Sequence, residues 1–149
     1  MSLGIDLEIF AKLGIALLLS LPLALNREAA QRAAGLRTFT LVAVTACGFC
    51  LVGERFLENI NSNSRLMQGV IGGLGFLGGG AILKHQGEVQ GLATAAAIWS
   101  SGVIGVACAY GEWEVGFVLM AVNFAVLWVG EKLKRSLNGG DEDPRPNVD

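Results

Sequence analysis

A glycine-rich run between Gly69 and Gly80 is the feature that most constrains the fold of this chain. Seven of these twelve residues are glycine, and none is charged. In water, each glycine inside a helix costs about 1 kcal/mol relative to alanine, so a soluble helix of this composition would be unstable. In a bilayer the backbone must satisfy its own hydrogen bonds as a helix, and glycine lets neighbouring helices approach closely. The run therefore predicts a tightly packed membrane helix.

The overall composition also indicates a membrane protein. Of the 149 residues, 52% are hydrophobic and 16% are charged, whereas about 25% are charged in an average soluble protein. The net charge of −2 provides no basic excess that would indicate a nucleic acid partner. We expect one transmembrane domain over residues 1–135. The acidic tail over residues 136–149, rich in glycine and proline, is expected to be disordered and cytoplasmic.

Five apolar segments have approximately the length of a membrane span. A bilayer core about 30 Å thick needs roughly 17 to 25 helical residues. The segments are residues 7–25, 36–53, 66–83, 91–110 and 115–129. The sequence thus predicts an all-α membrane protein with about five transmembrane helices. Glu28 and Arg32 stand four residues apart, which favours continuation of the first helix past the membrane until Gly35 ends it.

Lysine and arginine are distributed unevenly between the two sets of helix ends. Positively charged loops stay in the cytoplasm, so this distribution predicts an external N-terminus and a cytoplasmic C-terminus. The inner set is Arg27, Arg32, Arg37, Lys84, Lys132, Lys134 and Arg135, and the outer set is Arg55 and Arg65. The basic residues after the first and fifth spans could also hold anionic lipid headgroups.

Two short segments share the pattern G-L-x-T at the cytoplasmic start of an outward-running helix. Gly35, Arg37 and Thr38 belong to the first segment, and Gly91 and Thr94 belong to the second. One interpretation is a parallel repeat, in which spans one and two correspond to spans three and four. Two helix N-termini on one side, each with a partial positive charge, would then form an anion or headgroup site. The other interpretation is that helix-capping chemistry occurs twice by coincidence.

Glycines in the third span are expected to pack against a neighbouring helix, because residues four apart share a helix face. Three consecutive glycines could instead break the helix and expose its backbone to a ligand. Asn123 is expected to form a hydrogen bond between helices. The residues assigned to helix packing are Gly69, Gly73, Gly75, Gly78, Gly79, Gly80 and Asn123.

The sequence gives little indication of catalysis. It contains no nucleophile constellation and no phosphate-binding loop of the G-x-x-x-x-G-K type, so we expect no enzymatic activity and no cofactor. The lone His85 cannot form a metal cage. Cys47 and Cys50 have the spacing of a redox pair, but their apolar setting disfavours the thiolate. Trp99 lies in mid-span, which suggests a packed anchor or the wall of a pocket.

These motifs resemble the MgtC/SapB family of bacterial inner-membrane proteins. The resemblance covers most of residues 5–135 and implies a five-helix membrane domain without enzymatic activity. It further implies a role in magnesium limitation, with regulation of the F-type ATP synthase as one proposed activity. The shared residues are Arg27, the segments 34–38, 73–78 and 94–96, and Gly80, Ile82, Gly91, Leu92, Trp99 and Gly105.

The chain departs from the family pattern at three positions and in length. Asn26 stands where an acidic residue is common, Ala93 where a polar residue is frequent, and Ser100 where cysteine or another small residue is found. We also expect this chain to lack the soluble cytoplasmic domain that longer members of the family carry.

Two functions from different classes follow from the sequence. The favoured one is a non-enzymatic inner-membrane protein that acts through helix contacts in magnesium limitation or stress, as a homo-oligomer such as a dimer. The alternative is a transporter or channel for magnesium or another small solute, although no carboxylate lies in mid-membrane. The residues assigned to ligand or partner binding are Asn26, Arg27, Gly35, Arg37, Thr38, Gly91, Thr94 and Trp99.

Overall fold

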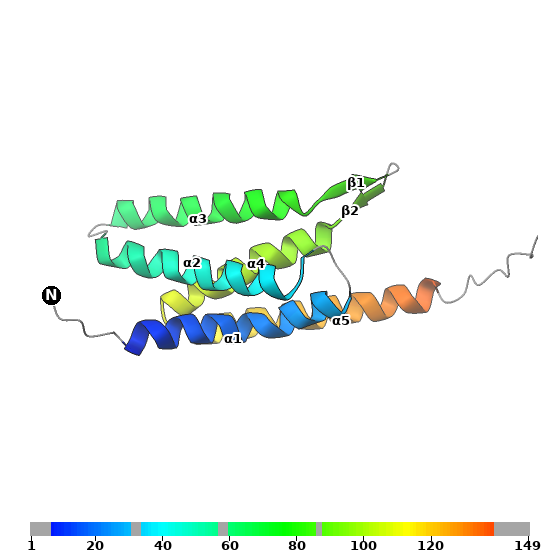
Figure 1. Cartoon of the computed structure of the whole chain (residues 1–149), viewed down its shortest axis with the longest axis horizontal. Helices are drawn as coiled ribbons and strands as arrows, with labels where there is room; N and C mark the ends of the chain where they lie inside the picture. Colours follow the sequence, from blue (N-terminus) through cyan, green and yellow to red (C-terminus); the bar gives the residue numbers. More distant parts are fainter. Residues whose placement is uncertain (1–6, 31–33, 57–59, 86–87, 139–149) are drawn as a thin grey trace, which may run out of the picture.

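The computed structural model describes residues 7–30, 34–56, 60–85 and 88–138. In these residues the chain forms five helices and one β-hairpin (Figure 1). The helices are α1 (Leu7–Ala29), α2 (Leu36–Phe56), α3 (Ile60–Gly80), α4 (Leu92–Ala109) and α5 (Trp113–Asn138), and the antiparallel strands are β1 (Leu83–His85) and β2 (Glu88–Gln90). The all-α membrane fold is confirmed, and the hairpin was not predicted.

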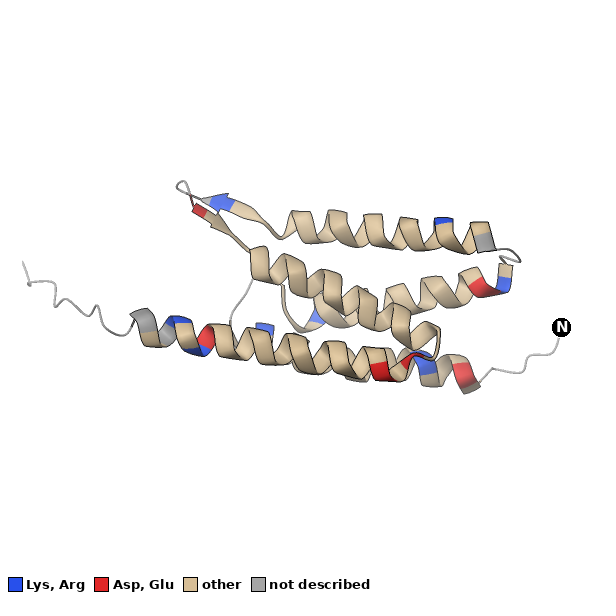
Figure 2. Ribbon diagram, turned by 180° about the vertical axis from the view of Figure 1, so that it is seen from behind, with Lys and Arg blue, Asp and Glu red and all other residues tan. Residues whose placement is uncertain are grey.

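The helices lie side by side, with α2 and α4 at the centre. Helices α1, α3 and α5 run in one direction and α2 and α4 in the other (Figure 1). Helix α1 packs against both central helices, as does α3, while α5 packs against α1 and α4. Charged residues lie towards the two ends of the helices and leave a middle stretch without charge in the described chain (Figure 2).

Four of the five helices are long and apolar enough to cross a membrane by length and composition. Helix α3 is not among these four, because its first turns are polar, with the sequence INSNSR, and much of the remainder is glycine. It is nevertheless 21 residues long, which corresponds to about 31 Å. Helix α3 is therefore about as long as the other helices and lies beside α2 in the same bundle.

The central contact between α2 and α4 is close. The hydroxyl of Ser101 donates a hydrogen bond of 2.8 Å to the carbonyl oxygen of Phe39. One turn later, Gly105 lies directly against the backbone carbonyl of Ala43. Each pair joins residues 62 positions apart (101 − 39 and 105 − 43). The two helices therefore run parallel, and small residues of α4 meet the backbone of α2.

The glycines of α3 pack less than predicted within the chain. A Cβ at Gly78 would lie 3.2 Å from the carbonyl oxygen of Ala95 in α4, so this glycine is in close contact. Leu74, four residues earlier, packs on Gly102. These contacts turn the Leu74 and Gly78 face of α3 toward α4 and leave the other glycines with open space. A Cβ would meet nothing within 4 Å at Gly69, Gly73, Gly75, Gly79 or Gly80.

Several predicted boundaries differ from those observed. Helix α1 ends at Ala29 and not at Gly35, which instead precedes α2. Residues 60–65, predicted as part of a loop, form the first turns of α3, because a helix can continue through polar residues once it leaves the apolar region. Helix α3 ends at the triple glycine, and α5 extends to Asn138. Arg32 and residues 139–149 lie outside the described residues.

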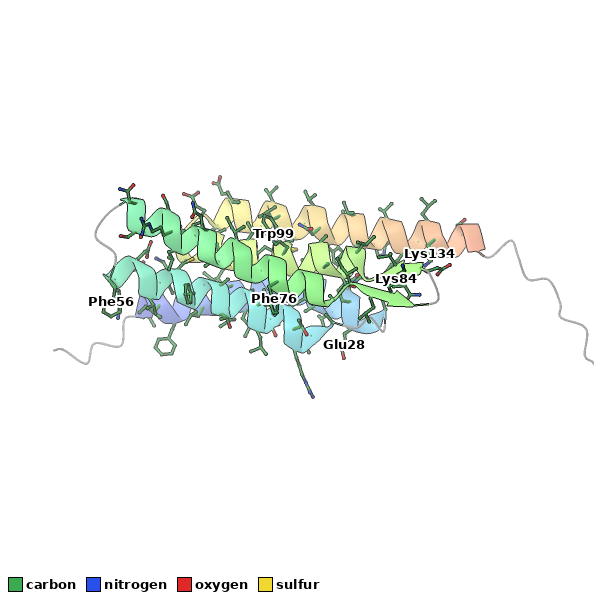
Figure 3. The ribbon with its side chains drawn as sticks, turned by 90° about the horizontal axis from the view of Figure 1, so that it is seen from above. Glu28, Phe56, Phe76, Lys84, Trp99 and Lys134 are labelled. Atoms are coloured by element: carbon green, nitrogen blue, oxygen red, sulfur yellow. The ribbon has the colours of Figure 1, made fainter. Side chains whose placement is uncertain are left out.

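Two side chains differ from their predicted roles. The amide of Asn123 donates to the carbonyl oxygen of Leu119 at 2.6 Å, so it bonds within α5 and not between helices. Trp99 is 43% exposed and forms no buried anchor. It lies between the ribbons of α3 and α5 when the molecule is seen from above (Figure 3). Glu8 and Lys12, four residues apart in α1, form an ion pair of 3.0 Å.

We predict that Gly105→Ala destabilises the fold by about 1–3 kcal/mol, because overpacking forces the backbones apart. The new Cβ would lie 2.8 Å from the carbonyl carbon of Ala43. Gly14→Ala is the control, since a Cβ there meets nothing within 4 Å. Unfolding in mixed micelles, followed by circular dichroism, measures the difference. Equal stability of the two variants would contradict the close contact.

The predicted orientation can be tested with single cysteines in a variant that lacks Cys47, Cys50 and Cys108. Lys84, Lys134 and Glu28 lie at one end of the molecule and Phe56 at the other (Figure 3). A cysteine at the exposed position of Glu112 should react with an impermeant reagent in intact cells, whereas one at Ser136 should react only after lysis. The reverse pattern would overturn the orientation.

Candidate functional site

A buried arginine lies at the end of α1 that we assign to the cytoplasmic side. Arg27 is 3% exposed and occupies the last turn of α1. Its Nη1 atom lies 3.3 Å from Oε1 of Glu131 in α5. A buried cation requires an anionic partner, because the unpaired charge would be strongly unfavourable there. The pair therefore joins the first and last helices of the chain.

A pocket of about 390 Å³ opens beside this pair. We call it the α4 pocket, because residues from the N-terminus of α4 form one wall. Arg27 comes from α1, and the remaining wall comes from α5. The lining residues are Arg27, Gly91, Ala93, Thr94, Val126, Leu127, Gly130, Glu131 and Lys134. The pocket combines basic, hydroxyl and acidic groups at one end with apolar residues at the other.

The N-terminus of α4 faces this pocket without a side-chain cap. Gly91 has φ of 91°, a left-handed conformation that favours glycine, and a Cβ there would collide with the carbonyl oxygen of Ala81. No side-chain hydrogen bond caps the helix at Gly91. Thr94 is 3% exposed and lines the pocket, and within the described residues its hydroxyl has no hydrogen-bond partner. Backbone amides and one hydroxyl thus remain available to a ligand.

The corresponding N-terminus of α2 is already occupied. The carboxylate of Glu28 accepts a hydrogen bond of 2.8 Å from the backbone amide of Leu36. Gly35 makes room for that carboxylate, since a Cβ there would collide with it. The two G-L-x-T segments both lie at the starts of helices, as predicted, but α2 receives its cap from α1. The sequence reasoning missed this role of Glu28.

The structure brings together part of the predicted site. Arg27, Gly91 and Thr94 line one pocket, and Asn26 precedes Arg27 in α1. The buried Oδ1 atom of Asn26 has no hydrogen-bond partner in the described part of the chain. The predicted residues that lie elsewhere are Gly35, Arg37, Thr38 and Trp99.

Glu131 and Lys134 were missed as members of the site. They stand three apart near the end of α5, so they share a helix face. Arg27 lies at the corresponding end of α1, and opposite charges at equal membrane depth are a signal that could have suggested the pair. The signal alone does not show which helices are neighbours.

A second hollow lies on another side of the molecule. We call it the α2–α3 groove; its volume is about 440 Å³. The groove is apolar, and two of the open glycines line it. The lining residues are Val42, Thr45, Ala46 and Phe49 of α2 with Gly69, Val70, Gly73, Leu74 and Leu77 of α3.

The three cysteines are buried and free. Cys47 and Cys50 belong to the hydrophobic core, which places them away from solvent. In the part of the chain that the structure describes, no group of three His, Cys, Asp or Glu side chains could hold a metal ion.

Comparison with known proteins identifies the family. The sequence model of the MgtC family matches residues 13–136, which is most of the chain. The chain belongs to the MgtC family. This confirms the resemblance found in the sequence. No solved structure gives a significant match.

Three relatives illustrate the range of the family. SrpB of Synechococcus elongatus is 40% identical over 72% of this chain and 66% of its own length. SapB of Bacillus subtilis is 32% identical over 87% of this chain and 61% of its own length. MgtC of Salmonella typhimurium is 39% identical over 66% of this chain and 42% of its own length. The matches thus span from two-fifths to two-thirds of these relatives.

We predict that Arg27→Gln lowers the free energy of unfolding by about 3–5 kcal/mol, because it leaves the Glu131 carboxylate without its partner. The double variant Arg27→Gln, Glu131→Gln removes both charges and should recover a large part of that loss. Unfolding in mixed micelles provides the measurement. If the double variant is no more stable than Arg27→Gln alone, the ion pair is not the reason for the loss.

Proposed function

We propose that this protein is a non-enzymatic inner-membrane protein that acts through helix contacts in the physiology of magnesium limitation or stress. Membership of the MgtC family supports the physiological part of the proposal. The α2–α3 groove supports the mechanism. An apolar groove bordered by glycines suits the close approach of another helix.

The arrangement of the helices within the chain favours another helix as the occupant of the α2–α3 groove. Helices α1 and α3 each flank the central pair of α2 and α4. On one side, α5 packs against α1 and α4. On the other side the α2–α3 groove has no helix of the described chain in it, and the glycines that line it have open space. The central pair of α2 and α4 therefore has two comparable sides, of which one is covered by α5.

A second copy of this chain is the occupant that we propose. Two-fold association about an axis along the membrane normal would place the glycines of α3 in one copy against those of its partner. Gly69 and Gly73 lie four residues apart, which is the small-residue spacing that permits close helix contact. The dimer could then act on a larger membrane complex, and the F-type ATP synthase is the candidate that the family suggests.

We predict that Gly73→Leu abolishes dimerisation and leaves the folded monomer intact. A side chain at this position meets nothing within 4 Å in the single chain, but it would fill the proposed interface. Gly14→Leu is the matched control, because that glycine is equally open and lies on α1. Light scattering in detergent, with inter-copy crosslinking in membranes, reports the oligomeric state.

A Gly73→Leu protein that remains as dimeric as the Gly14→Leu protein would contradict the α2–α3 groove as the interface. A monomeric state of the unmodified chain in both detergent and native membranes would contradict the homo-oligomer itself.

Transport of magnesium or another small solute is the competing function. We expect proteoliposomes that contain the purified protein to show the same magnesium flux as empty liposomes under an imposed gradient. This follows because the described helices have no mid-membrane carboxylates, which a path for a divalent cation commonly uses. Protein-dependent flux that saturates with magnesium would overturn a purely contact-based mechanism.

A further inference from the structure

The α4 pocket has the features of a site for a phosphate-bearing anion. Backbone amides at a helix N-terminus, together with the helix dipole, favour an anion at that position. Thr94, which is 3% exposed, lines the pocket and adds a hydroxyl donor that has no partner in the described chain. Arg27 of α1 and Lys134 of α5 add positive charge to the same pocket. Backbone amides, a hydroxyl and positively charged side chains thus line the same pocket.

The same chain shows which kind of group such a helix end accepts. At the N-terminus of α2, the carboxylate of Glu28 binds the amide of Leu36 at 2.8 Å. The N-terminus of α4 begins with the same G-L-x-T pattern but has a pocket of about 390 Å³ in front of it. The position that an internal carboxylate fills at α2 is therefore open to an external anion at α4.

The charge of the pocket favours a singly charged anion. Arg27 and Lys134 contribute two positive charges and Glu131 one negative charge, so the side chains sum to +1. The helix N-terminus adds about half a positive charge. A phosphodiester carries one negative charge and matches this balance, whereas a phosphate dianion would exceed it.

The position and apolar wall of the pocket favour a lipid as the source of the phosphodiester. Thr94 lies in the first turn of α4 and Arg27 in the last turn of α1, so the polar wall lies where helices leave the apolar region. Val126, Ala93 and Gly130 also line the pocket and are exposed on the surface of the helices. An acyl chain could follow these residues while the headgroup stays at the polar wall.

We infer that the α4 pocket binds the phosphodiester headgroup of an anionic phospholipid, held by the Thr94 hydroxyl, the first amides of α4, Arg27 and Lys134. Glu131 keeps Arg27 in place and limits the positive charge, which excludes more highly charged anions. This inference is independent of the proposed dimer, because the α2–α3 groove shares no lining residue with the pocket.

Binding of phosphatidylglycerol to the purified full chain tests the inference. Native mass spectrometry gives the dissociation constant for the unmodified chain and for Thr94→Val, which removes the hydroxyl at nearly constant volume. We expect Thr94→Val to weaken binding about tenfold, as befits a hydrogen bond to a charged group. Thr40→Val is the control, because the Thr40 hydroxyl donates to Leu36 within its own helix at 2.7 Å. Thr40→Val should bind phosphatidylglycerol with the same dissociation constant as the unmodified chain.

Two further binding measurements identify which part of the lipid the pocket recognises. Diacylglycerol with the same acyl chains lacks the phosphate and should bind much more weakly than phosphatidylglycerol. Inorganic phosphate, added at matched ionic strength, should not displace the lipid. Equal binding by Thr94→Val and Thr40→Val, or equal binding of diacylglycerol, would overturn the site. Displacement by inorganic phosphate would overturn the lipid as its ligand.

Discussion

The close parallel contact between α2 and α4 is the interaction on which the rest of the structure depends. Ser101 bonds to the backbone of α2 at 2.8 Å, and Gly105 lies against the same helix one turn later. In a membrane, where lipid competes equally for apolar side chains, such packing and hydrogen bonding are what hold helices together. All other helices in the described chain then arrange themselves around this pair, with α1 and α3 on its flanks and α5 beside α1 and α4.

Helix number and class could be predicted because the length of an apolar segment is a local property. The close contacts could not, because a run of glycines does not show which face meets a neighbour. The glycine run in the sequence drew attention to Gly75, but a Cβ at Gly75 would meet no neighbouring atom. The glycines that make close contacts between helices are Gly102 and Gly105, in α4, whose sequence has no comparable glycine run. For the site, Arg27 and Thr94 carry recognisable chemistry. Glu131 belongs to it only because α5 returns to α1, which is a fact of tertiary packing.

The helix starts at the two G-L-x-T segments have different chemistry despite their common pattern. Contact pairs between α2 and α4 are 62 residues apart, whereas the glycines of the G-L-x-T segments are 56 apart (91 − 35). If the two G-L-x-T segments lay at the same height, contacting residues of α2 and α4 would also be 56 apart. The difference of six residues therefore corresponds to a displacement of α4 by about 9 Å along its axis. Because of this displacement, the N-terminus of α4 extends beyond that of α2, where Glu28 has already supplied the cap.

Gly91 also lies where the connection after α3 meets the N-terminus of α4. Its backbone packs directly against the carbonyl of Ala81, the residue that follows α3, and it lines the α4 pocket. The hairpin of β1 and β2 closes the same connection. Helix α3 and the pocket are therefore joined by one short connection. A side chain larger than hydrogen at Gly91 would therefore disturb the end of α3 and the first turn of α4 together, because a Cβ there would collide with the carbonyl oxygen of Ala81.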